Sequence, residues 1–218
     1  DELPYVDMTR QLAAVFPANG GTFQVEPDAS GGSYFWAVNA LFDPAGQGGV
    51  SVRHWPTSGW QVDARFPGCL PLARPLSRST DLGDSIMTAM MLAPWAPRPV
   101  AFTDLGRLRV QECERVAALR TELTRCGATV METGDTLEIA PGPLHGAVIE
   151  TYDDHRMAMC FAILGLKVPG IKLKNPACVK KTFPNFFQKW AAPAPGGLGA
   201  VIRDAAGRVL AGDELHAD

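Results

Sequence analysis

Three stretches of the chain are hydrophobic at nearly every position, and each follows a short polar segment. The stretches are residues 34–42, 86–93 and 157–164, and the polar segments are residues 28–30, 81–85 and 153–156. A helix without a polar face must be buried, and polar side chains at its start can cap the first free N–H groups. The pattern predicts three buried helices from one repeated unit, with N-termini that share an anion-attracting surface. An ordinary α/β protein with three buried helices is the alternative.

Two further helices and several strands follow from the periodicity. Residues 4–16 form an amphipathic pattern that starts at Pro4, whose missing N–H costs nothing in a first helical turn. Residues 111–126 place Val116, Leu119 and Leu123 on one face, and Gly127 is typical of a helix stop. Strands are predicted at residues 22–25, 49–53, 100–103, 129–131, 136–139, 147–150 and 171–173. Strands that alternate with helices indicate an α/β fold.

Two segments have the composition of connections. Residues 65–80 contain three prolines and no clear period, which predicts a long irregular connection. Residues 191–197 are rich in Ala, Pro and Gly and are expected to form a linker. Beyond them, residues 200–203 and 208–210 could pair as a hairpin.

Composition narrows the classes of partner and site. The 218 residues are 46% hydrophobic, enough for one large domain or two small ones. A net charge of −3 gives no global positive field, so we expect neither nucleic acid nor a membrane surface as partner. The five cysteines are odd in number and lack a CxxC pair, which fits the reducing cytoplasm. The histidines show no metal-ligand spacing, so no metal site is expected.

Two motifs combine acidic and basic side chains. Glu112 and Arg115 are three residues apart near a predicted helix start, so both could address one ligand; an exposed salt bridge is the common alternative. Arg156 falls in the first turn of a predicted helix, where its charge opposes the helix dipole. A bound anion would relieve this conflict, and so would a simple ion pair with Asp154.

Two other positions carry candidate charges. Asp84 stands at the head of a predicted buried helix, where a plain N-cap is the alternative role. Lys180 and Lys181 precede an aromatic segment that contains Pro184, and a surface position is the alternative for this basic pair.

Several motifs occur in one order along residues 4–189. They are Glu26-Pro27-Asp28-Ala29-Ser30, Ser33-Tyr34-Phe35, Asp84, Arg109-x-x-Glu112-Cys113-Glu114-Arg115, Gly127-Ala128, Thr151-Tyr152-Asp153-Asp154-His155-Arg156-Met157-Ala158-Met159 and Lys181-Thr182-Phe183-Pro184. Taken together, they resemble the C-terminal half of the EPSP synthase family. The last two motifs are the most specific. The sister family of UDP-N-acetylglucosamine enolpyruvyl transferases shares the fold but usually lacks them, and it is the alternative.

The resemblance implies a fold and a reaction. The family has two lobes built from βαβαββ units, an inside-out α/β arrangement with helix N-termini facing the cleft. Residues 1–28 would be the end of one lobe, residues 29–190 most of the other, and residues 191–218 a linker and tail. The family is a cytoplasmic transferase of the shikimate pathway. It moves the enolpyruvyl group of phosphoenolpyruvate to the 5-hydroxyl of shikimate 3-phosphate and releases phosphate, without cofactor or metal.

The resemblance also implies roles for individual residues. Asp84 resembles the carboxylate that binds the shikimate hydroxyl and takes its proton, and Glu112 resembles the acid that protonates phosphoenolpyruvate. His155 resembles an orienting residue beside them. Phosphoenolpyruvate would be held by Arg115, Arg156 and Lys181, and shikimate 3-phosphate by Asp84, Gln111, Arg107 and Tyr5.

Three departures from the family pattern stand out. Gln111 occupies a place where the family usually has Lys or His, and Arg107 one where Asn is common. Residues 65–80 are shorter than usual, so one βαβαββ unit is expected to be abridged. The family's N-terminal half is missing; it is the expected partner, without which the chain should be inactive. The same pattern would also fit a non-catalytic binding module or one half of a split synthase.

Overall fold

A four-stranded sheet forms from residues 76–140 in the computed structural model, which describes residues 2–43 and 49–218. Its elements follow one another as β1 (Leu76–Ser77), α3 (Ile86–Met90), β2 (Val100–Thr103), α4 (Arg115–Arg125), β3 (Thr129–Thr133) and β4 (Thr136–Ala140). The strand order is β1-β2-β4-β3, with β1 parallel to β2 and β4 antiparallel to both its neighbours. The expected βαβαββ succession is therefore confirmed in this part of the chain.

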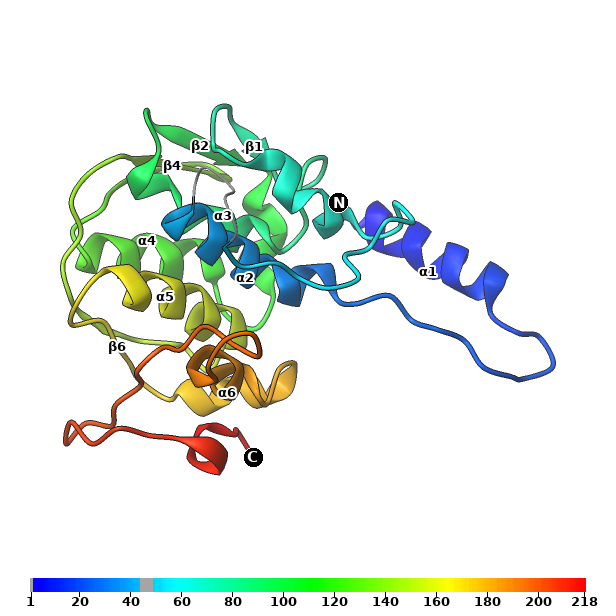
Figure 1. Ribbon diagram of the computed structural model, residues 1–218. Helices are drawn as coiled ribbons and strands as arrows, with labels where there is room; N and C mark the ends of the chain where they lie inside the picture. Colours follow the sequence, from blue (N-terminus) through cyan, green and yellow to red (C-terminus); the bar gives the residue numbers. More distant parts are fainter. Residues whose placement is uncertain (1, 44–48) are drawn as a thin grey trace.

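The sheet buries one face against helices and leaves the other outward (Figure 1). Val100 and Phe102 of β2, like Leu137 and Ile139 of β4, alternate with more exposed neighbours and enter the core. This alternation follows from the opposite directions of successive side chains in a strand. The edge strand β3 contributes no fully buried side chain.

A second, smaller unit follows the sheet. Strands β5 (Val148–Ile149) and β6 (Lys172–Leu173) pair in parallel, and α5 (His155–Lys167) connects them. A 3₁₀ helix over Pro176–Lys181 and α6 (Phe186–Ala191) come next. The strands predicted at residues 100–103, 129–131, 136–139, 147–150 and 171–173 are thus confirmed, within two residues at their ends.

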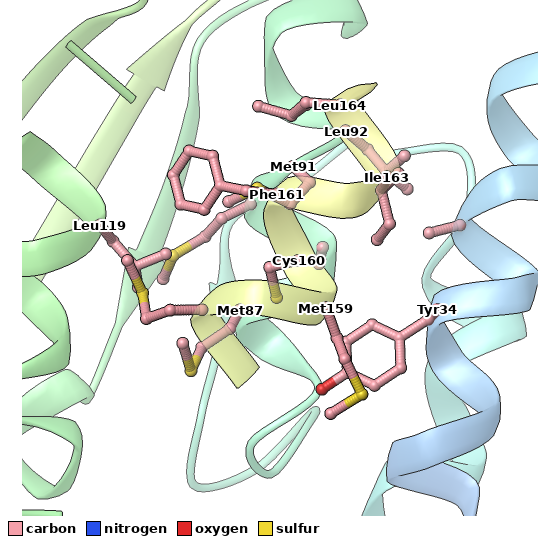
Figure 2. Packing of buried hydrophobic residues seen from close by; sticks show 14 of the residues in the cluster. Tyr34, Met87, Met91, Leu92, Leu119, Met159, Cys160, Phe161, Ile163 and Leu164 are labelled. Atoms are coloured by element: carbon pink, nitrogen blue, oxygen red, sulfur yellow. The ribbon is translucent and has the colours of Figure 1, made fainter. Parts of the chain in front are cut away.

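The predicted buried helices form the centre of the molecule. Helices α2 (Ala29–Phe42), α3 and α5 contact one another. Figure 2 shows α5 between the other elements, with Leu119 of α4 on one side and Tyr34 of α2 on the other. Ser33 of α2 and Thr88 of α3 share a hydrogen bond of 2.9 Å between their hydroxyls. The starts of α2 and α3 therefore lie close together, as the repeated pattern predicts.

The helix starts are capped in two different ways. The Asp28 side chain accepts from the N–H groups of Ser30 and Gly31, and Asp154 accepts from the N–H of Arg156. At α3, Asp63 from a distant 3₁₀ helix (Val62–Cys69) accepts from the Ser85 N–H at 2.9 Å. Asp84 therefore does not cap α3, and the plain N-cap alternative for it is wrong.

Residues 2–28 extend from the body as an arm (Figure 1). Helix α1 (Leu3–Val15) confirms the predicted helix but buries none of its residues. The strand predicted at residues 22–25 is wrong, and so is the one at residues 49–53. Neither segment lies beside another strand in the described part of the chain, and a strand without a partner cannot form a ladder of hydrogen bonds.

Two helix boundaries differ from prediction. Helix α3 ends at Met90, and a 3₁₀ helix over Ala93–Trp95 follows, because Pro94 has no N–H to continue an α-helix. Helix α4 begins at Arg115 rather than residue 111, since the Glu114 side chain caps it by accepting from the Ala117 N–H. Gly127 ends it with a φ of +93°, as predicted.

The tail returns to the body after the Pro/Gly-rich segment. A single antiparallel bridge joins Arg203 to Val209, and further on the Ala217 N–H donates to the Pro184 carbonyl at 2.9 Å. None of the helices in the described ranges has the length and hydrophobicity needed to span a bilayer.

Candidate active site

Asp84 lies at the centre of a cluster of charged side chains. Its Oδ1 accepts from Nη2 of Arg78 at 2.8 Å, and its Oδ2 is 3.4 Å from Nη1 of Arg115 and 3.4 Å from Nε of Arg156. The three arginines come from the segment after β1, from α4 and from α5. Asp84 precedes α3, so the βαβαββ unit and the second unit meet at this carboxylate.

The surroundings of Asp84 keep it ionised. Burial by itself would raise the pKa of its carboxyl group, but Arg156, Arg78 and Arg115 together outweigh burial and hold the pKa below the ordinary value. An ionised carboxylate in a half-closed, cationic site can accept a proton from a hydroxyl.

Arg115 is the most enclosed cation of the cluster, with 1% of its side chain exposed. Its Nε donates to Oδ2 of Asp154 at 2.7 Å, Nη2 to Oε2 of Glu112 at 2.6 Å, and Nη1 to the side-chain oxygen of Gln111. Asp154 therefore pairs with Arg115, and the predicted alternative of an Asp154–Arg156 side-chain pair is wrong. The exposed-salt-bridge alternative is also wrong: the Glu112–Arg115 ion pair forms, but Arg115 is buried. A buried charge must be compensated by opposite charges.

Glu112 joins two cations of the cluster. It lies in the loop before α4, so it does not share a helical face with Arg115, yet Oε2 still meets Arg115, and Oε1 accepts from Nζ of Lys181. Burial would raise the pKa of Glu112, but the hydrogen bond from Lys181 and the charge of Arg115 lower it to about 2. Glu112 is thus a carboxylate in the ligand-free chain.

Arg156 and His155 occupy the first turn of α5. Nη1 of Arg156 donates to Oγ of Ser30, in the first turn of α2, at 2.5 Å. His155 is 3% exposed, and its Nδ1 is buried without a hydrogen-bond partner among the described residues. Burial, reinforced by the charge of Arg156, lowers the pKa of His155 to about 4. The imidazole is therefore neutral near pH 7.

Tyr5 of the arm reaches the same site. Its hydroxyl accepts from the Asp84 N–H at 3.1 Å and lies 3.4 Å from Oδ2 of Asp63. Burial, with the charges of Asp63 and Asp84, raises the pKa of Tyr5. Gly83 permits this approach, since a Cβ there would lie 2.0 Å from the Tyr5 hydroxyl oxygen.

Arg107 stands further out. Its Nε is 3.4 Å from Oε1 of Glu2, which also accepts from Nη1 of Arg78 at 3.1 Å. Arg107 therefore connects to Asp84 only through Glu2 and Arg78. Asp84, Glu112, His155, Arg115, Arg156, Lys181, Gln111 and Tyr5 gather in one cluster, whereas Arg107 lies at its rim.

Three members of the site were not predicted as site residues from the sequence, although Ser30 lies in one of the motifs. Arg78 lies in the segment predicted to be an irregular connection, yet it is 2% exposed and holds Asp84. Asp63 accepts from the Ser85 N–H and from the Tyr5 hydroxyl, and Ser30 accepts from Arg156. Burial of a charged residue in a proline-rich segment is decided by tertiary contacts, so spacing could not identify Arg78. No group of three or more His, Cys, Asp or Glu side chains suited to a metal ion occurs in residues 2–43 and 49–218.

Comparisons with known proteins point to one family. A sequence model of EPSP synthase (3-phosphoshikimate 1-carboxyvinyltransferase) matches residues 79–190. The 3-phosphoshikimate 1-carboxyvinyltransferase of Nostoc punctiforme is 38% identical over 188 residues, which cover 77% of this chain and 43% of the relative. That of Methanosphaerula palustris is 37% identical over 199 residues, 82% of this chain and 45% of the relative. The chain thus spans less than half the length of these curated relatives.

A solved structure supports the same fold. EPSP synthase from Acinetobacter baumannii superposes with a TM-score of 0.56 at 20% sequence identity, over 79% of this chain and 48% of that one. At this identity the likeness concerns the fold alone.

Proposed function

The chain belongs to the EPSP synthase family, and on this premise we propose that it supplies the phosphoenolpyruvate-binding and proton-transferring part of a 3-phosphoshikimate 1-carboxyvinyltransferase. The reaction would move the enolpyruvyl group of phosphoenolpyruvate to the 5-hydroxyl of shikimate 3-phosphate and release phosphate. The observation that carries the proposal is the meeting of Asp84 and Glu112 with the cations Arg115, Arg156 and Lys181.

The three cations suit the charges of phosphoenolpyruvate. The substrate carries a phosphate and a carboxylate, and a guanidinium can bind either group with two parallel hydrogen bonds. In the ligand-free chain Glu112 occupies Nη2 of Arg115 and Nζ of Lys181. A bound anion would take over these donors and release Glu112 towards the substrate, while Asp154 continues to compensate Arg115 from its Nε side.

Asp84 and Glu112 divide the proton transfers. Glu112, once protonated, would donate a proton to the methylene carbon of phosphoenolpyruvate, which leaves positive charge on the neighbouring carbon. The 5-hydroxyl oxygen then bonds to that carbon, and Asp84 takes the hydroxyl proton. When the carbon–oxygen bond to phosphate breaks, the methyl group returns a proton to Glu112, and the leaving phosphate accepts the proton from Asp84. Protons and charges balance without a cofactor.

Glu112 must change its protonation state for this role. Its pKa of about 2 follows from burial outweighed by Lys181 and Arg115, so the free chain holds it ionised. Substrate anions bound to the same two cations would offset their charge and raise the pKa of Glu112 towards the range of a general acid. Asp84 faces Arg78 as well, and this partner would keep it ionised in the complex.

The rest of the enzyme would complete the site. We assign Tyr5, Gln111 and Arg107 to the shikimate 3-phosphate side, His155 to orientation, and the remaining contacts to the N-terminal half of a synthase. The assignment of the remaining contacts to an N-terminal half is supported by the chain's coverage of less than half of each relative. Retention of the charged cluster favours half of a working synthase over a non-catalytic binding module. The five free cysteines support the cytoplasm as its compartment.

Phosphoenolpyruvate binding to the 218-residue chain tests the proposal directly. Lys181→Met should weaken binding about 10- to 100-fold, the loss expected for one charge-assisted hydrogen bond. The neighbouring Lys180→Met is a matched control, because its Nζ donates to the main-chain oxygen of Asp218 and is not part of the cluster. Equal binding by wild type and Lys181→Met, or no binding by wild type at millimolar ligand, would contradict the proposal.

A further inference from the structure

Glu122 is a fully buried acid outside the charged cluster. It lies on α4, two helical turns beyond Arg115, with no exposed surface. Its Oε1 accepts from the Tyr152 hydroxyl at 2.9 Å, and its Oε2 accepts from the Glu150 N–H at 3.2 Å and lies 3.1 Å from Nη1 of Arg125. Glu122 therefore ties α4 to the segment that leads into α5.

That segment has an unfavourable backbone. Tyr152 and Asp153 have φ values of +56° and +54°, a left-handed conformation that is unfavourable for residues other than glycine. Two consecutive residues in this conformation persist only where surrounding contacts hold them. The contacts are the Tyr152–Glu122 hydrogen bond, a hydrogen bond from the Asn175 side chain to Asp153, and a 2.8 Å bond from the Thr151 hydroxyl to the Lys174 carbonyl.

The turn determines where three cluster residues lie. Directly after it, Asp154 caps α5 by accepting from the Arg156 N–H at 2.8 Å, and it accepts from Nε of Arg115 at 2.7 Å. His155 and Arg156 begin the helix itself. A change in the backbone of Tyr152 and Asp153 would therefore move the partner of Arg115 and the start of α5 together.

We propose that Glu122 and Tyr152 are positioning residues for the anion site, because their hydrogen bond holds the left-handed turn that sets Asp154 between Arg115 and Arg156. This proposal rests on the proposed function. Glu122 is also held in a fixed position relative to Arg115, since both residues lie on α4. The buried side chain of Glu122 thus fixes the positions of Arg115 and Arg156 relative to each other, although it contacts neither.

Three substitutions test the proposal in the 218-residue chain. Tyr152→Phe removes only the hydroxyl from a side chain that is 37% exposed, so the fold should persist. It should weaken phosphoenolpyruvate binding about three- to tenfold, the loss expected for one hydrogen bond. Glu122→Gln keeps one oxygen that can accept from Tyr152, but its NH2 group replaces the oxygen that accepts from the Glu150 N–H, so this variant should weaken binding as well. Glu150→Gln is the matched control, because it lies two residues before Tyr152 and its side chain pairs only with the exposed Lys174 among the described residues.

Thermal unfolding and titration with phosphoenolpyruvate should be measured on all four proteins. Weaker binding by Tyr152→Phe at an unchanged unfolding temperature, with near-normal binding by Glu150→Gln, supports positioning. Wild-type affinity in Tyr152→Phe, or an equal loss in Glu150→Gln, overturns it. If wild type itself does not bind phosphoenolpyruvate, the proposed function fails; if wild type binds and only the variant pattern fails, the positioning role alone is wrong.

Discussion

Glu112 is ionised by the same two cations that the proposed substrate would occupy. Its pKa of about 2 results from burial outweighed by Lys181 and Arg115. A residue in this position links the binding of an anion to the uptake of a proton, because the anion offsets the charges that keep the carboxylate ionised.

We therefore expect phosphoenolpyruvate binding to take up protons through Glu112. The sign follows from the pKa, which starts near 2 and rises in the complex, so the complex holds more protons and affinity increases as pH falls. Calorimetric titration at mildly acidic pH in two buffers of different ionisation enthalpy measures the uptake. Glu112→Gln is the control, since the ligand's own phosphate titrates equally with both proteins. Identical proton uptake in the two proteins would contradict the linkage.

His155 gives a prediction about stability. Burial and the charge of Arg156 lower its pKa to about 4, whereas an unfolded histidine titrates near 6.5. As pH falls from 6.5 to 4, protons bind the unfolded chain but not the folded one, so the folded state loses up to about 3 kcal/mol. Urea unfolding of wild type and His155→Gln at neutral pH and just above the folded pKa measures the difference. A parallel fall in both proteins would show that His155 is not the cause.

Asp84 and Glu112 give a prediction about catalysis when the 218-residue chain is combined with the N-terminal half of a relative. Asp84→Asn and Glu112→Gln should each lower kcat by about 10²- to 10⁴-fold, the range for a positioned acid or base, with smaller effects on KM. Arg208→Gln is a matched control, because Arg208 pairs with Asp204 and Glu214 in the tail rather than with the cluster. Near-normal kcat in either acidic variant would exclude the assigned role.

At the scale of elements, the starts of α2 and α5 carry the site. Asp28 caps α2 through two N–H groups at 3.0 Å each, next to Ser30, which contacts Arg156. The cap and the contact lie within one helical turn, so a frayed α2 would release Arg156 from its partner.

Asp28→Ala should lower the free energy of unfolding by about 1 kcal/mol, the usual contribution of a side-chain N-cap. Urea unfolding measures this. Asp7→Ala provides the comparison, because Asp7 lies on the exposed helix α1 in a 3.7 Å ion pair with Arg10, and such pairs contribute little. A loss in Asp7→Ala equal to that in Asp28→Ala would contradict the capping role.

At the scale of the whole molecule, the chain presents one main body and an arm whose helix contains no fully buried residue. Closure of two lobes around substrates excludes water and aligns reacting groups, an effect that can reach about 7–11 kcal/mol of the barrier. The exposed side chains of the arm include Leu3, Val6, Val15 and Phe16.

We expect the 218-residue chain alone to fold and to show no synthase activity. Addition of the N-terminal half of a relative should restore phosphate release from phosphoenolpyruvate plus shikimate 3-phosphate, in proportion to the added half until saturation. The Glu112→Gln chain with the same half is the control for contaminating activity. Substantial turnover by the chain alone would require a site built in another way, for example across two copies.

The sequence by itself determined the elements whose signals are local. Capped apolar stretches predicted α2, α3 and α5, because a helix without a polar face has only one stable environment. Five strands between residues 100 and 173 were predicted because period-two burial is a property of the strand itself. The specific motifs around Asp84, Glu112, Arg115, Arg156 and Lys181 identified the family. The resemblance to that family implied most of the residues of the charged cluster.

Only the tertiary structure decided which strands pair and which charged side chains form ion pairs. Residues 22–25 and 49–53 have strand-like patterns but lack a neighbouring strand, and no local signal reports a missing partner. The Asp154 side chain pairs with Arg115 rather than with Arg156, which is nearer in sequence, and Arg78 is buried against Asp84. Each buried charge must be compensated, and the packing of the helices decides which opposite charge lies close enough. Sequence spacing fixes which side chains an element offers, and packing fixes which of them meet.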